Sequence, residues 1–422
     1  MGTSHDPDPS ATFGPAPASE APVPEAIAVA RAPAARGQPL AVRIALLGTT
    51  GFLLAISWQV VLPVLPLHLS RIGYTATQVG ILVSLLSLAM GIVELEVGRV
   101  AGMFGRRWTL LGGLLANAAA MIGVAQARAA AAVGGALAGV GASRALMWAP
   151  LHASVAAAAS EETRGRAFGV FWFLTSVGFL AGPAIGGVVG ARYGDRVVFY
   201  LGAGISLIIL PVIFATTTPG RPTLRLTASG VGAVLRHPTV FRLCLANHLY
   251  YAVTGIWSTF LPLYAATQGL GVLVVGEVFA VQGLTYALVQ IPTGRLADRW
   301  GPERLVLPGL AGRSAIALLV PLLHSTTALL LAGAVYGFVG GLVPVTFTTL
   351  MARLSPRDRY TTAMGVYNSS GDLGFFIGPL MGGAAALLGI VGPFVLCAPL
   401  GLAAVIAGLG VAAAIGSSRS QI

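Results

Sequence analysis

The charged residues that lie within long apolar stretches of this chain include Glu94, Arg144 and Asp372. An ionisable side chain in hydrocarbon is costly unless it has a partner or lines a water-filled cavity, and such groups often handle protons, ions or substrates. We therefore expect Asp372 to bind a proton or a substrate group, with a structural hydrogen-bonding role as the alternative. Arg144 carries the opposite charge and could pair with Asp372 directly or through water, and a bound proton would then change the pairing. The alternative for Arg144 is a buried charge pair that specifies packing.

Two acids stand close together at the end of one apolar stretch. Glu94 and Glu96 lie near its polar edge, just before a basic segment. Long side chains at such an edge can bend towards water or pair with a neighbouring charge, here Arg99. A proton relay is the other interpretation, and it makes Glu94 a third candidate for proton coupling.

Composition indicates which elements position these groups. Of the 422 residues, 56% are hydrophobic and 9% are charged, and the mean hydropathy is +0.84, so most of the chain cannot be a water-soluble domain. A helix needs about 20 apolar residues to cross a ~30 Å hydrocarbon core. The stretches are unbroken rather than alternating, which favours helices over barrel strands. We predict an all-α membrane protein with twelve transmembrane helices. They are expected at residues 44–68, 76–97, 109–127, 131–158, 166–190, 197–216, 243–266, 272–293, 305–323, 327–351, 362–388 and 391–415.

An internal repeat divides these helices into two halves. When the chain is displaced by 196 positions, Pro66 falls on Pro262 and Gly80 falls on Gly276, and the same offset holds along the whole apolar region. One constant offset indicates duplication of a single unit. In an apolar protein, such a repeat is typical of transporters. We therefore predict two pseudo-symmetric six-helix bundles that face each other across a shared pocket.

The arrangement of arginines predicts the orientation in the membrane. All 25 basic residues are arginines, and nineteen of them fall on one side of the predicted helices, four on the other, with Arg144 and Arg313 inside helices. Short cytoplasmic loops retain positive charge, so both termini are expected in the cytoplasm of a bacterial cell, with the chain in its inner membrane. This topology also accounts for the net charge of +11 without a nucleic-acid partner.

Low-complexity segments set the expected domain boundaries. The first 38 residues are rich in proline, alanine and small polar residues and cannot bury enough apolar surface to fold. Cys244 and Cys397 form neither a disulfide framework nor a metal-binding motif, so no metal and no cofactor are expected. The expected domains are a disordered cytoplasmic tail (1–38), an N-terminal bundle (39–216), a cytoplasmic linker (217–242), a C-terminal bundle (243–416) and a cytoplasmic tail (417–422).

Two basic segments share a glycine pattern at the predicted cytoplasmic ends of the second and eighth helices. The first reads GRVAGMFGRR and the second GRLADRWGPER. The second resembles the loop signature of the major facilitator superfamily, in which glycines permit a tight turn and an acid, here Asp298, pairs with an arginine or caps a helix. Such a clamp would favour one arrangement of the bundles; the alternative is a basic loop that only sets topology. Gly102 replaces the acid in the first copy, which weakens that clamp. The gating candidates are Gly98, Arg99, Gly105, Gly294, Arg295, Asp298, Arg299 and Gly301.

The fifth and eleventh helices carry matching glycine and proline patterns. The fifth resembles the signature of proton-coupled drug antiporters in that superfamily, and the eleventh repeats it. Glycines four positions apart let another backbone approach closely, which is how membrane helices gain packing. Each proline removes one backbone hydrogen bond and bends its helix. The residues are Gly178, Gly182, Pro183, Gly186, Gly187, Gly374, Gly378, Pro379, Gly382 and Gly383.

The resemblance covers residues 40–416 and implies roles for further residues. Arg144 corresponds to the arginine of the family's fourth-helix motif, which is associated with proton transfer, although Met147 and Trp148 replace the following Gln and Gly. The resemblance also implies a central cavity where aromatic rings and amides could hold an amphipathic molecule, with simple packing as the alternative. The candidates are Trp58, Gln59, Trp148, His152, Asn247, Tyr251, Trp257 and Tyr336, and Asn368 on the face that carries Asp372.

No reactive constellation is present in the sequence. It contains no His-Glu-x-x-His, no Gly-x-Ser-x-Gly and no Walker loop, so we expect neither an enzyme nor an ATP-driven pump. We expect a secondary active transporter, acting as a monomer, that exports a small organic, drug-like or amphipathic molecule in exchange for protons by alternating access. Proton-coupled or facilitative uptake of a small metabolite is one alternative. A transport-inactive membrane receptor or scaffold is the other.

Overall fold

A computed structural model describes residues 40–160, 163–217, 232, 235–355 and 360–419. The predicted tail 1–38 and most of the predicted linker 217–242 lie outside the described residues. The first seven helices are α1 (Leu40–Gln59), α2 (Leu65–Arg71), α3 (Ala76–Phe104), α4 (Arg106–Gln126), α5 (Ala130–Ala158), α6 (Arg164–Tyr193) and α7 (Asp195–Thr216). The second set is α9 (Pro238–Thr267), α10 (Val272–Trp300), α11 (Pro302–Leu319), α12 (Thr326–Leu354), α13 (Tyr360–Ala385) and α14 (Gly392–Arg419), with short 3-10 turns at Val320–Leu322 and Ala386–Leu388.

Within the described part of the chain, eleven helices are long and apolar enough to cross a membrane. The fold is therefore an all-helical membrane fold. The long helix outside this set is α9, whose residues include Arg242, Asn247 and His248 and most of whose side chains are buried. A helix enclosed by its neighbours can carry polar groups that lipid would not tolerate.

The helix boundaries repeat with the same offset as the sequence. α3 begins at Ala76 and α10 at Val272, 196 positions later, and their last residues are separated by the same offset. α5 and α12 also match at both ends. The turns repeat as well, because Gly73 and Gly269 adopt φ values of +105° and +72°, a region that favours glycine. The repeat in the sequence is therefore matched by a repeat of helix boundaries and turns.

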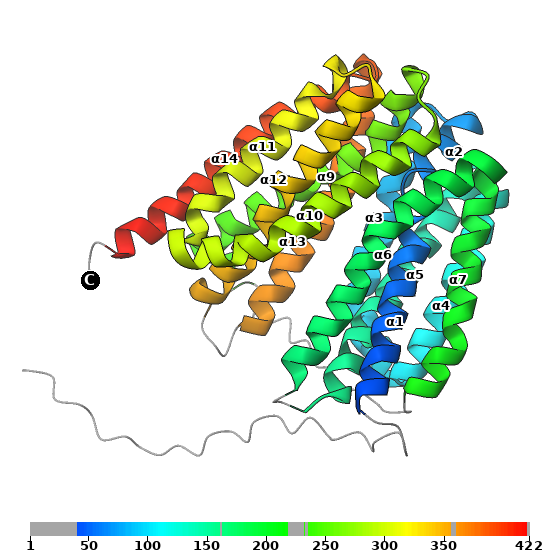
Figure 1. Cartoon of the computed structure of the whole chain (residues 1–422), viewed down its shortest axis with the longest axis horizontal. Helices are drawn as coiled ribbons and strands as arrows, with labels where there is room; N and C mark the ends of the chain where they lie inside the picture. Colours follow the sequence, from blue (N-terminus) through cyan, green and yellow to red (C-terminus); the bar gives the residue numbers. More distant parts are fainter. Residues whose placement is uncertain (1–39, 161–162, 218–231, 233–234, 356–359, 420–422) are drawn as a thin grey trace, which may run out of the picture.

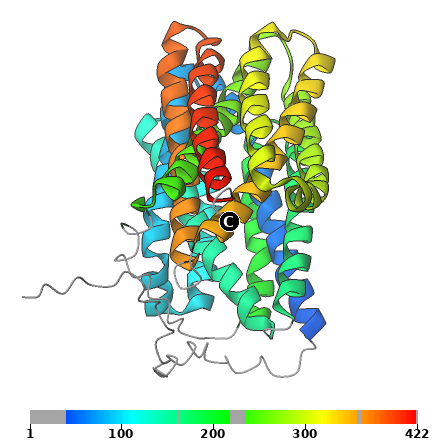
Figure 2. The same ribbon diagram turned by 90° about the vertical axis from the view of Figure 1, so that its left-hand side faces the viewer.

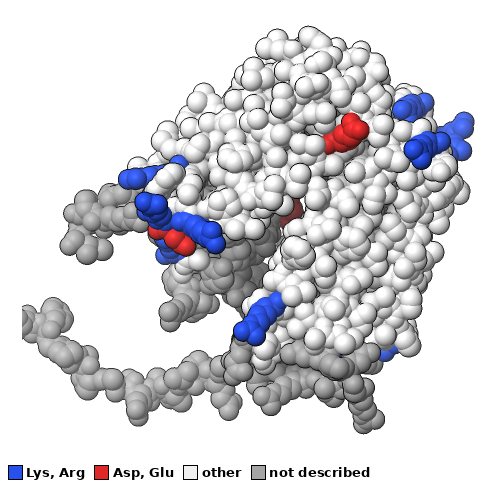
Figure 3. Space-filling model, viewed as in Figure 1, with Lys and Arg blue, Asp and Glu red and all other residues white. Residues whose placement is uncertain are grey.

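The helices form two groups that are inclined to each other (Figure 1). α1 to α7 form the first group and α9 to α14 the second, and the view from the side shows the long helices of the second group side by side (Figure 2). The groups meet at the end that carries α2, here called the closed end. They separate towards the end where α6 and α13 begin, here called the open end. The space-filling view shows a hollow between the groups, with acidic atoms visible inside it (Figure 3).

Backbone contacts between glycine-bearing helices join the two groups at the closed end. α3 packs on α13, and α6 packs on α10. A Cβ atom at Gly80 would lie 2.4 Å from the carbonyl oxygen of Pro379, and one at Gly276 would lie 2.6 Å from that of Pro183. The two contacts are related by the repeat. Close approach of this kind requires glycine, so these positions seal the closed end.

The structure corrects the first predicted helix, 44–68. α1 ends at Gln59, residues 60–64 form a turn, and α2 begins at Leu65. Pro63 has no backbone N–H and its ring clashes with the preceding turn, which breaks the helix. The amides of Val61 and Leu62 accordingly bond three residues back, to Trp58 and Gln59.

The predicted gating loops are also mostly helical. Gly98 and Arg99 lie within α3, and Gly294, Arg295, Asp298 and Arg299 lie within α10. The turn is made by one glycine in each copy, since Gly105 and Gly301 have φ values of +83° and +87°. Apolar length alone places the helix ends too early here, because helices continue beyond the hydrocarbon layer into its polar edge.

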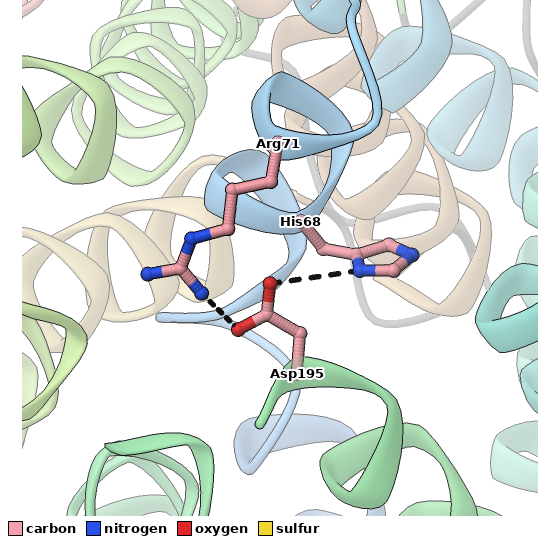
Figure 4. Close-up of polar contacts among 3 residues, drawn as sticks. All are labelled: His68, Arg71 and Asp195. Atoms are coloured by element: carbon pink, nitrogen blue, oxygen red, sulfur yellow. Dashed lines mark hydrogen bonds and ion pairs between the residues drawn. The ribbon is translucent and has the colours of Figure 1, made fainter.

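Charged side chains fasten the short α2 to α7 at the closed end (Figure 4). The Arg71 guanidinium donates to the Asp195 carboxylate, and His68 Nδ1 lies 3.6 Å from the other carboxylate oxygen. The side chains of His68 and Asp195 are 5% and 7% exposed, and that of Arg71 is 53% exposed. The His68 ring also meets Phe199 edge-on at 5.0 Å. These contacts hold α2 in place after the break at Pro63.

Candidate functional site

The structure brings together the three charged residues singled out from the sequence. Glu94 from α3, Arg144 from α5 and Asp372 from α13 are each half-buried. The carboxyl groups of Glu94 and Asp372, here called the acid pair, lie close enough to act on each other, and the charge of Arg144 acts on both. Two neighbouring carboxylates repel each other, and a single proton relieves the repulsion because the carboxyl groups can then share it in a hydrogen bond. The cluster therefore has the chemistry of a site that takes up and releases a proton, built from both helix groups.

Arg144 contacts an aromatic ring in addition to interacting with the two acids. Its guanidinium carbon lies 4.0 Å from the ring centre of Trp58 on α1, and its Nε is buried with no hydrogen-bond partner among the residues that the structure describes. A cation over an indole face is stabilised electrostatically. The side chain therefore keeps a favourable contact whichever charge the acid pair carries. The two residues border a small pocket together with Leu54, Ser57, Asn117, Met147 and Trp148.

A polar network within the first group adjoins that pocket. The Asn117 amide donates to Ser206 Oγ at 2.8 Å and accepts from Ser143 Oγ at 3.1 Å. Ser57 Oγ donates to the Gly202 carbonyl oxygen at 2.8 Å. These bonds join α1, α4, α5 and α7 beside the pocket that Arg144 also lines. Because its buried groups are satisfied, the network gives the pocket a fixed wall.

On the opposite side, α9 holds the part of α13 that carries the acid. Asn247 Nδ2 donates to the Tyr367 carbonyl oxygen at 2.9 Å and to Ser370 Oγ at 3.0 Å. A Cβ atom at Gly371 would lie 2.9 Å from Cδ2 of Tyr251, so this ring packs directly on the backbone next to the acid. Asn247 and Tyr251 thus hold the part of α13 that carries Asp372.

Aromatic rings gather where α5 faces α6. Trp148 lies parallel to Trp172 at 6.5 Å and to Phe179 at 6.4 Å, and the His152 ring is 5.6 Å away. Trp172 is 46% exposed, while His152 Nε2 is buried and has no hydrogen-bond partner in the described part of the chain. Gln59 Nε2 donates to the Phe179 carbonyl oxygen at 3.5 Å. Such a surface of π faces with a few polar atoms suits an aromatic or amphipathic molecule.

Three residues predicted to line a cavity are enclosed instead. Trp257 and Tyr336 stack with ring centres 3.8 Å apart, and Trp257, Tyr336 and Asn247 are each no more than 1% exposed. Trp257 Nε1 donates to Gln282 Oε1 at 2.8 Å, and the Tyr336 hydroxyl donates to the Val253 carbonyl oxygen at 3.4 Å. Because the polar atoms of Trp257 and Tyr336 are satisfied inside the second group, these two rings pack the fold in this conformation. Asn247 is enclosed as well, but its Oδ1 has no hydrogen-bond partner among the described residues. The other candidates are half-buried or exposed: Trp58, Gln59, Trp148, His152, Tyr251 and Asn368.

The glycine patterns of α6 and α13 lie where backbones meet. A Cβ atom at Gly178 would lie 2.6 Å from the Phe52 carbonyl oxygen of α1, and one at Gly374 would lie 2.1 Å from the His248 carbonyl oxygen of α9. Each glycine helix therefore packs within its own group on one face and against the other group on another. Gly182 and Gly186 approach α1, Gly378 and Gly382 approach α9, and Gly187 and Gly383 face the opposite group.

The predicted gating residues lie at the open end. Glu96 and Arg99 form an exposed ion pair within α3, as the pairing interpretation predicted for Glu96. Glu94, two residues earlier, interacts with Asp372 of α13. Arg295, Asp298 and Arg299 are exposed on α10. Within the described ranges, no ion pair involves Asp298, so the expected clamp is not formed in this conformation.

Several polar residues at the centre of the second group could not be identified from motifs. Gln282 Oε1 accepts the hydrogen bond from Trp257 Nε1, and the Tyr250 hydroxyl donates to the Gly340 carbonyl oxygen at 3.0 Å. No spacing rule marks either side chain. The one available signal was Arg313, a single charge within an otherwise apolar stretch.

Comparison with known proteins places this geometry in a family. The model of the Major Facilitator Superfamily matches residues 47–281 and 243–415. A relative described as "Multi-drug resistance efflux pump PmrA homolog" from Lactococcus lactis subsp. lactis (strain IL1403) is 25% identical over 79% of this chain and 86% of its own length. "Multidrug resistance protein MdtG" from Serratia proteamaculans (strain 568) is 29% identical over 79% of this chain and 85% of its own length.

Solved structures share the fold at low sequence identity. The nucleoside transporter NupG has a TM-score of 0.73 and 13% identity, covering 89% of this chain and 99% of its own. A bacterial homolog of the human lysosomal transporter Spinster, solved in an inward-facing and unoccupied conformation, has a TM-score of 0.68 and 17% identity, covering 89% and 95%. Since the family model spans nearly all described helices, the chain belongs to the Major Facilitator Superfamily and is a multi-pass membrane transporter.

Proposed function

We propose that this chain exports a small amphipathic organic molecule in exchange for protons. The observation that carries the proposal is the packing of α3 on α13, which brings Glu94 of the first group and Asp372 of the second close enough to act on each other, with Arg144 beside them. A proton site made by both groups changes its geometry whenever the groups move. Proton binding and the movement between conformations are therefore coupled by the structure of the site.

In the proposed cycle, one proton is shared between Glu94 and Asp372 while the hollow faces the open end. Release of that proton leaves two carboxylates, which repel each other and attract Arg144. The guanidinium then bonds the acids more strongly at the expense of the Trp58 face. This change in charge favours separation of α3 from α13 at the closed end, where the same two helices meet at Gly80.

We also propose a topology of twelve spans, with α9 as the span of lowest hydropathy, in two six-helix halves. The open end, where α4, α6 and α13 begin, would face the cytoplasm. Its basic side chains include Arg99, Arg106, Arg107, Arg295 and Arg299, as expected for cytoplasmic loops.

The relatives support the substrate class. Both curated relatives are described as multidrug resistance or efflux proteins. The aromatic surface formed by Trp148, Trp172 and Phe179 offers stacking faces, and the acid pair offers negative charge. An amphipathic organic cation fits both features, because it can stack on the rings and pair with a carboxylate.

Uptake of ethidium, a planar amphipathic cation, into everted vesicles of an efflux-deficient host tests this proposal. We expect uptake that depends on an imposed proton gradient and stops when the gradient is collapsed. Asp372→Asn and Glu94→Gln should each lower the rate of gradient-driven uptake at least tenfold. This corresponds to an increase in activation free energy of roughly 1.4 kcal/mol or more. Glu96→Gln is the matched control, since this acid is two residues from Glu94 but pairs with Arg99 on the surface.

Two results would contradict the proposal. If Asp372→Asn transports with unchanged pH dependence, the acid pair is not the proton site. If expression of the protein protects cells against none of a panel of toxic amphipathic compounds, and vesicles transport none of these compounds, a metabolite importer or a transport-inactive receptor fits better.

A further inference from the structure

A second buried arginine lies in the other half of the molecule. Arg313 on α11 is 3% exposed, and its guanidinium donates to Tyr250 Oη and to Thr254 Oγ1, both at 3.0 Å. The guanidinium carbon lies 4.0 Å from the ring centre of Tyr336 and 4.5 Å from that of Tyr250. In the part of the chain that the structure describes, no carboxylate pairs with it. Tyrosine rings and hydroxyls thus stabilise a charge that would otherwise be very costly inside the protein.

In the second half, this guanidinium occupies the space where the residue equivalent to Arg144 would have its side chain. The position related to Arg144 by the offset of 196 is Gly340. A Cβ atom at Gly340 would lie 1.8 Å from Nη1 of Arg313, so the guanidinium fills the space where a side chain of residue 340 would begin. Thr254, which it also contacts, is related in the same way to Trp58 under Arg144. Each half therefore holds one guanidinium beside its first long helix, but the two arginines come from different helices.

A chain of contacts links Arg313 to the acid pair. The Tyr250 ring meets the Tyr251 ring edge-on at 5.1 Å. Tyr251 packs on the backbone of Gly371, the residue before Asp372. Tyr251 therefore lies between Tyr250, which Arg313 holds by a hydrogen bond, and the backbone next to Asp372. A change at Arg313 therefore reaches the acid through two tyrosines.

We propose that Arg313 is a positioning residue for proton coupling, which fixes Tyr250 and Tyr251 behind Asp372 and supplies positive charge from the second half. This inference rests on the proposed proton site. The other ionisable groups around the acid pair and the two tyrosines come from α3, α5, α9, α10 and α13. They are Glu94, Arg144, Cys244, His248, whose Nδ1 lies 3.2 Å from the Ser370 carbonyl oxygen, Tyr286 and Tyr367. With these groups unchanged, removal of the Arg313 charge makes the site less positive, so a proton binds at higher pH.

Tryptophan fluorescence of the purified protein in nanodiscs, titrated with acid, tests the proposal without a known substrate. Trp58 lies under Arg144, so its emission should change when the acid pair gains a proton. In Arg313→Gln we expect the midpoint of this transition at a proton concentration roughly threefold lower than in the unaltered protein. Arg313→Lys should return the midpoint most of the way to that of the unaltered protein, because it keeps the charge. Arg304→Gln, which removes an exposed arginine from the same helix, should leave the midpoint unchanged.

Tyr250→Phe keeps the test decisive if Arg313→Gln does not fold. It removes the hydroxyl that Arg313 holds while retaining the ring, and it should shift the midpoint in the same direction. An unchanged midpoint in folded Arg313→Gln or Tyr250→Phe, with only the thermal stability lowered, would show that Arg313 serves packing alone. Asp372→Asn separates the two proposals: if it leaves the transition intact, the proton site itself is wrong, and if it removes the transition while Arg313→Gln changes nothing, only the role of Arg313 is wrong.

Discussion

The two helix groups hold the closed end of the molecule in different ways. In the first group the chain breaks at Pro63, and α2 is fastened to α7 by charged side chains (Figure 4). In the second group Thr259 stands at the corresponding position, and α9 continues unbroken. Tyr264, which corresponds to His68, fastens α9 through its hydroxyl, which donates to the Pro321 carbonyl oxygen at 3.0 Å. Duplication has preserved where the chain turns, while the side chains that hold each turn have diverged.

The centre of the molecule diverges in charge rather than in backbone. Gln290 stands at the position in the second group that corresponds to Glu94, and Ser176 stands at the position in the first that corresponds to Asp372. A strictly symmetric duplicate would hold two acid pairs. Here each half supplies one acid, and a single pair forms between α3 and α13. Pseudo-symmetry thus provides the scaffold, and loss of symmetry concentrates the acid chemistry in one place.

Exchange of the residues at the break gives the largest expected effect. Thr259→Pro removes a backbone hydrogen bond within α9 and places a ring against the preceding turn, which costs about 3 kcal/mol or more. We expect a clearly lower midpoint of thermal unfolding for the purified protein. The reciprocal change, Pro63→Thr, should cost far less because the chain already turns there and the new residue fits a turn.

Equal effects of the two substitutions would break this comparison. They would mean that the two first helices tolerate proline alike, and that the break at 60–64 has another cause.

A clash at the seal between the groups should have the next largest effect. Gly80→Leu places a side chain against the backbone of α13 at Pro379, and such overpacking typically costs about 1–3 kcal/mol. The groups can relieve the clash only by moving apart, so the closed end should open. Distances between spin labels across that end would show a longer population. Gly91→Leu is the matched control on the same helix, because a Cβ atom at Gly91 would have nothing within 4 Å.

The repeat made much of the fold predictable from sequence. Its offset predicted that helices recur 196 positions apart, as α3 and α10 and then α5 and α12 do, and the glycines at 105 and 301 predicted the turns at the end of α3 and α10. The helix ends were less predictable, because hydropathy registers the hydrocarbon layer while α3 and α10 extend to Phe104 and Trp300. The break at Pro63 was missed for a related reason, since residues 60–64 remain apolar although the backbone leaves the helix.

The candidate site was predictable where it depends on charge. A buried acid or arginine stands out in an apolar sequence, and Glu94, Arg144 and Asp372 meet in the structure. Aromatic residues gave a weaker signal, because a ring that lines a cavity and a ring that packs a core have the same composition. Trp257 and Tyr336 were therefore assigned to the cavity, although they stack on each other in the second group. Only their three-dimensional neighbours distinguish the two roles.

The smallest expected effect comes from the contacts that fasten each half at the closed end. Asp195→Asn removes the charge that Arg71 and His68 share, and the cost should be only about 1 kcal/mol because water can solvate the half-exposed Arg71. Tyr264→Phe removes the corresponding hydroxyl in the second group at a similar cost, about 1 kcal/mol. The two substitutions differ in their response to salt. Salt screens the ion pair but not the neutral hydrogen bond, so the loss of thermal stability in Asp195→Asn should shrink as ionic strength rises, while that in Tyr264→Phe should stay constant. The same salt response in both variants would mean that charge does not distinguish how the two halves are held.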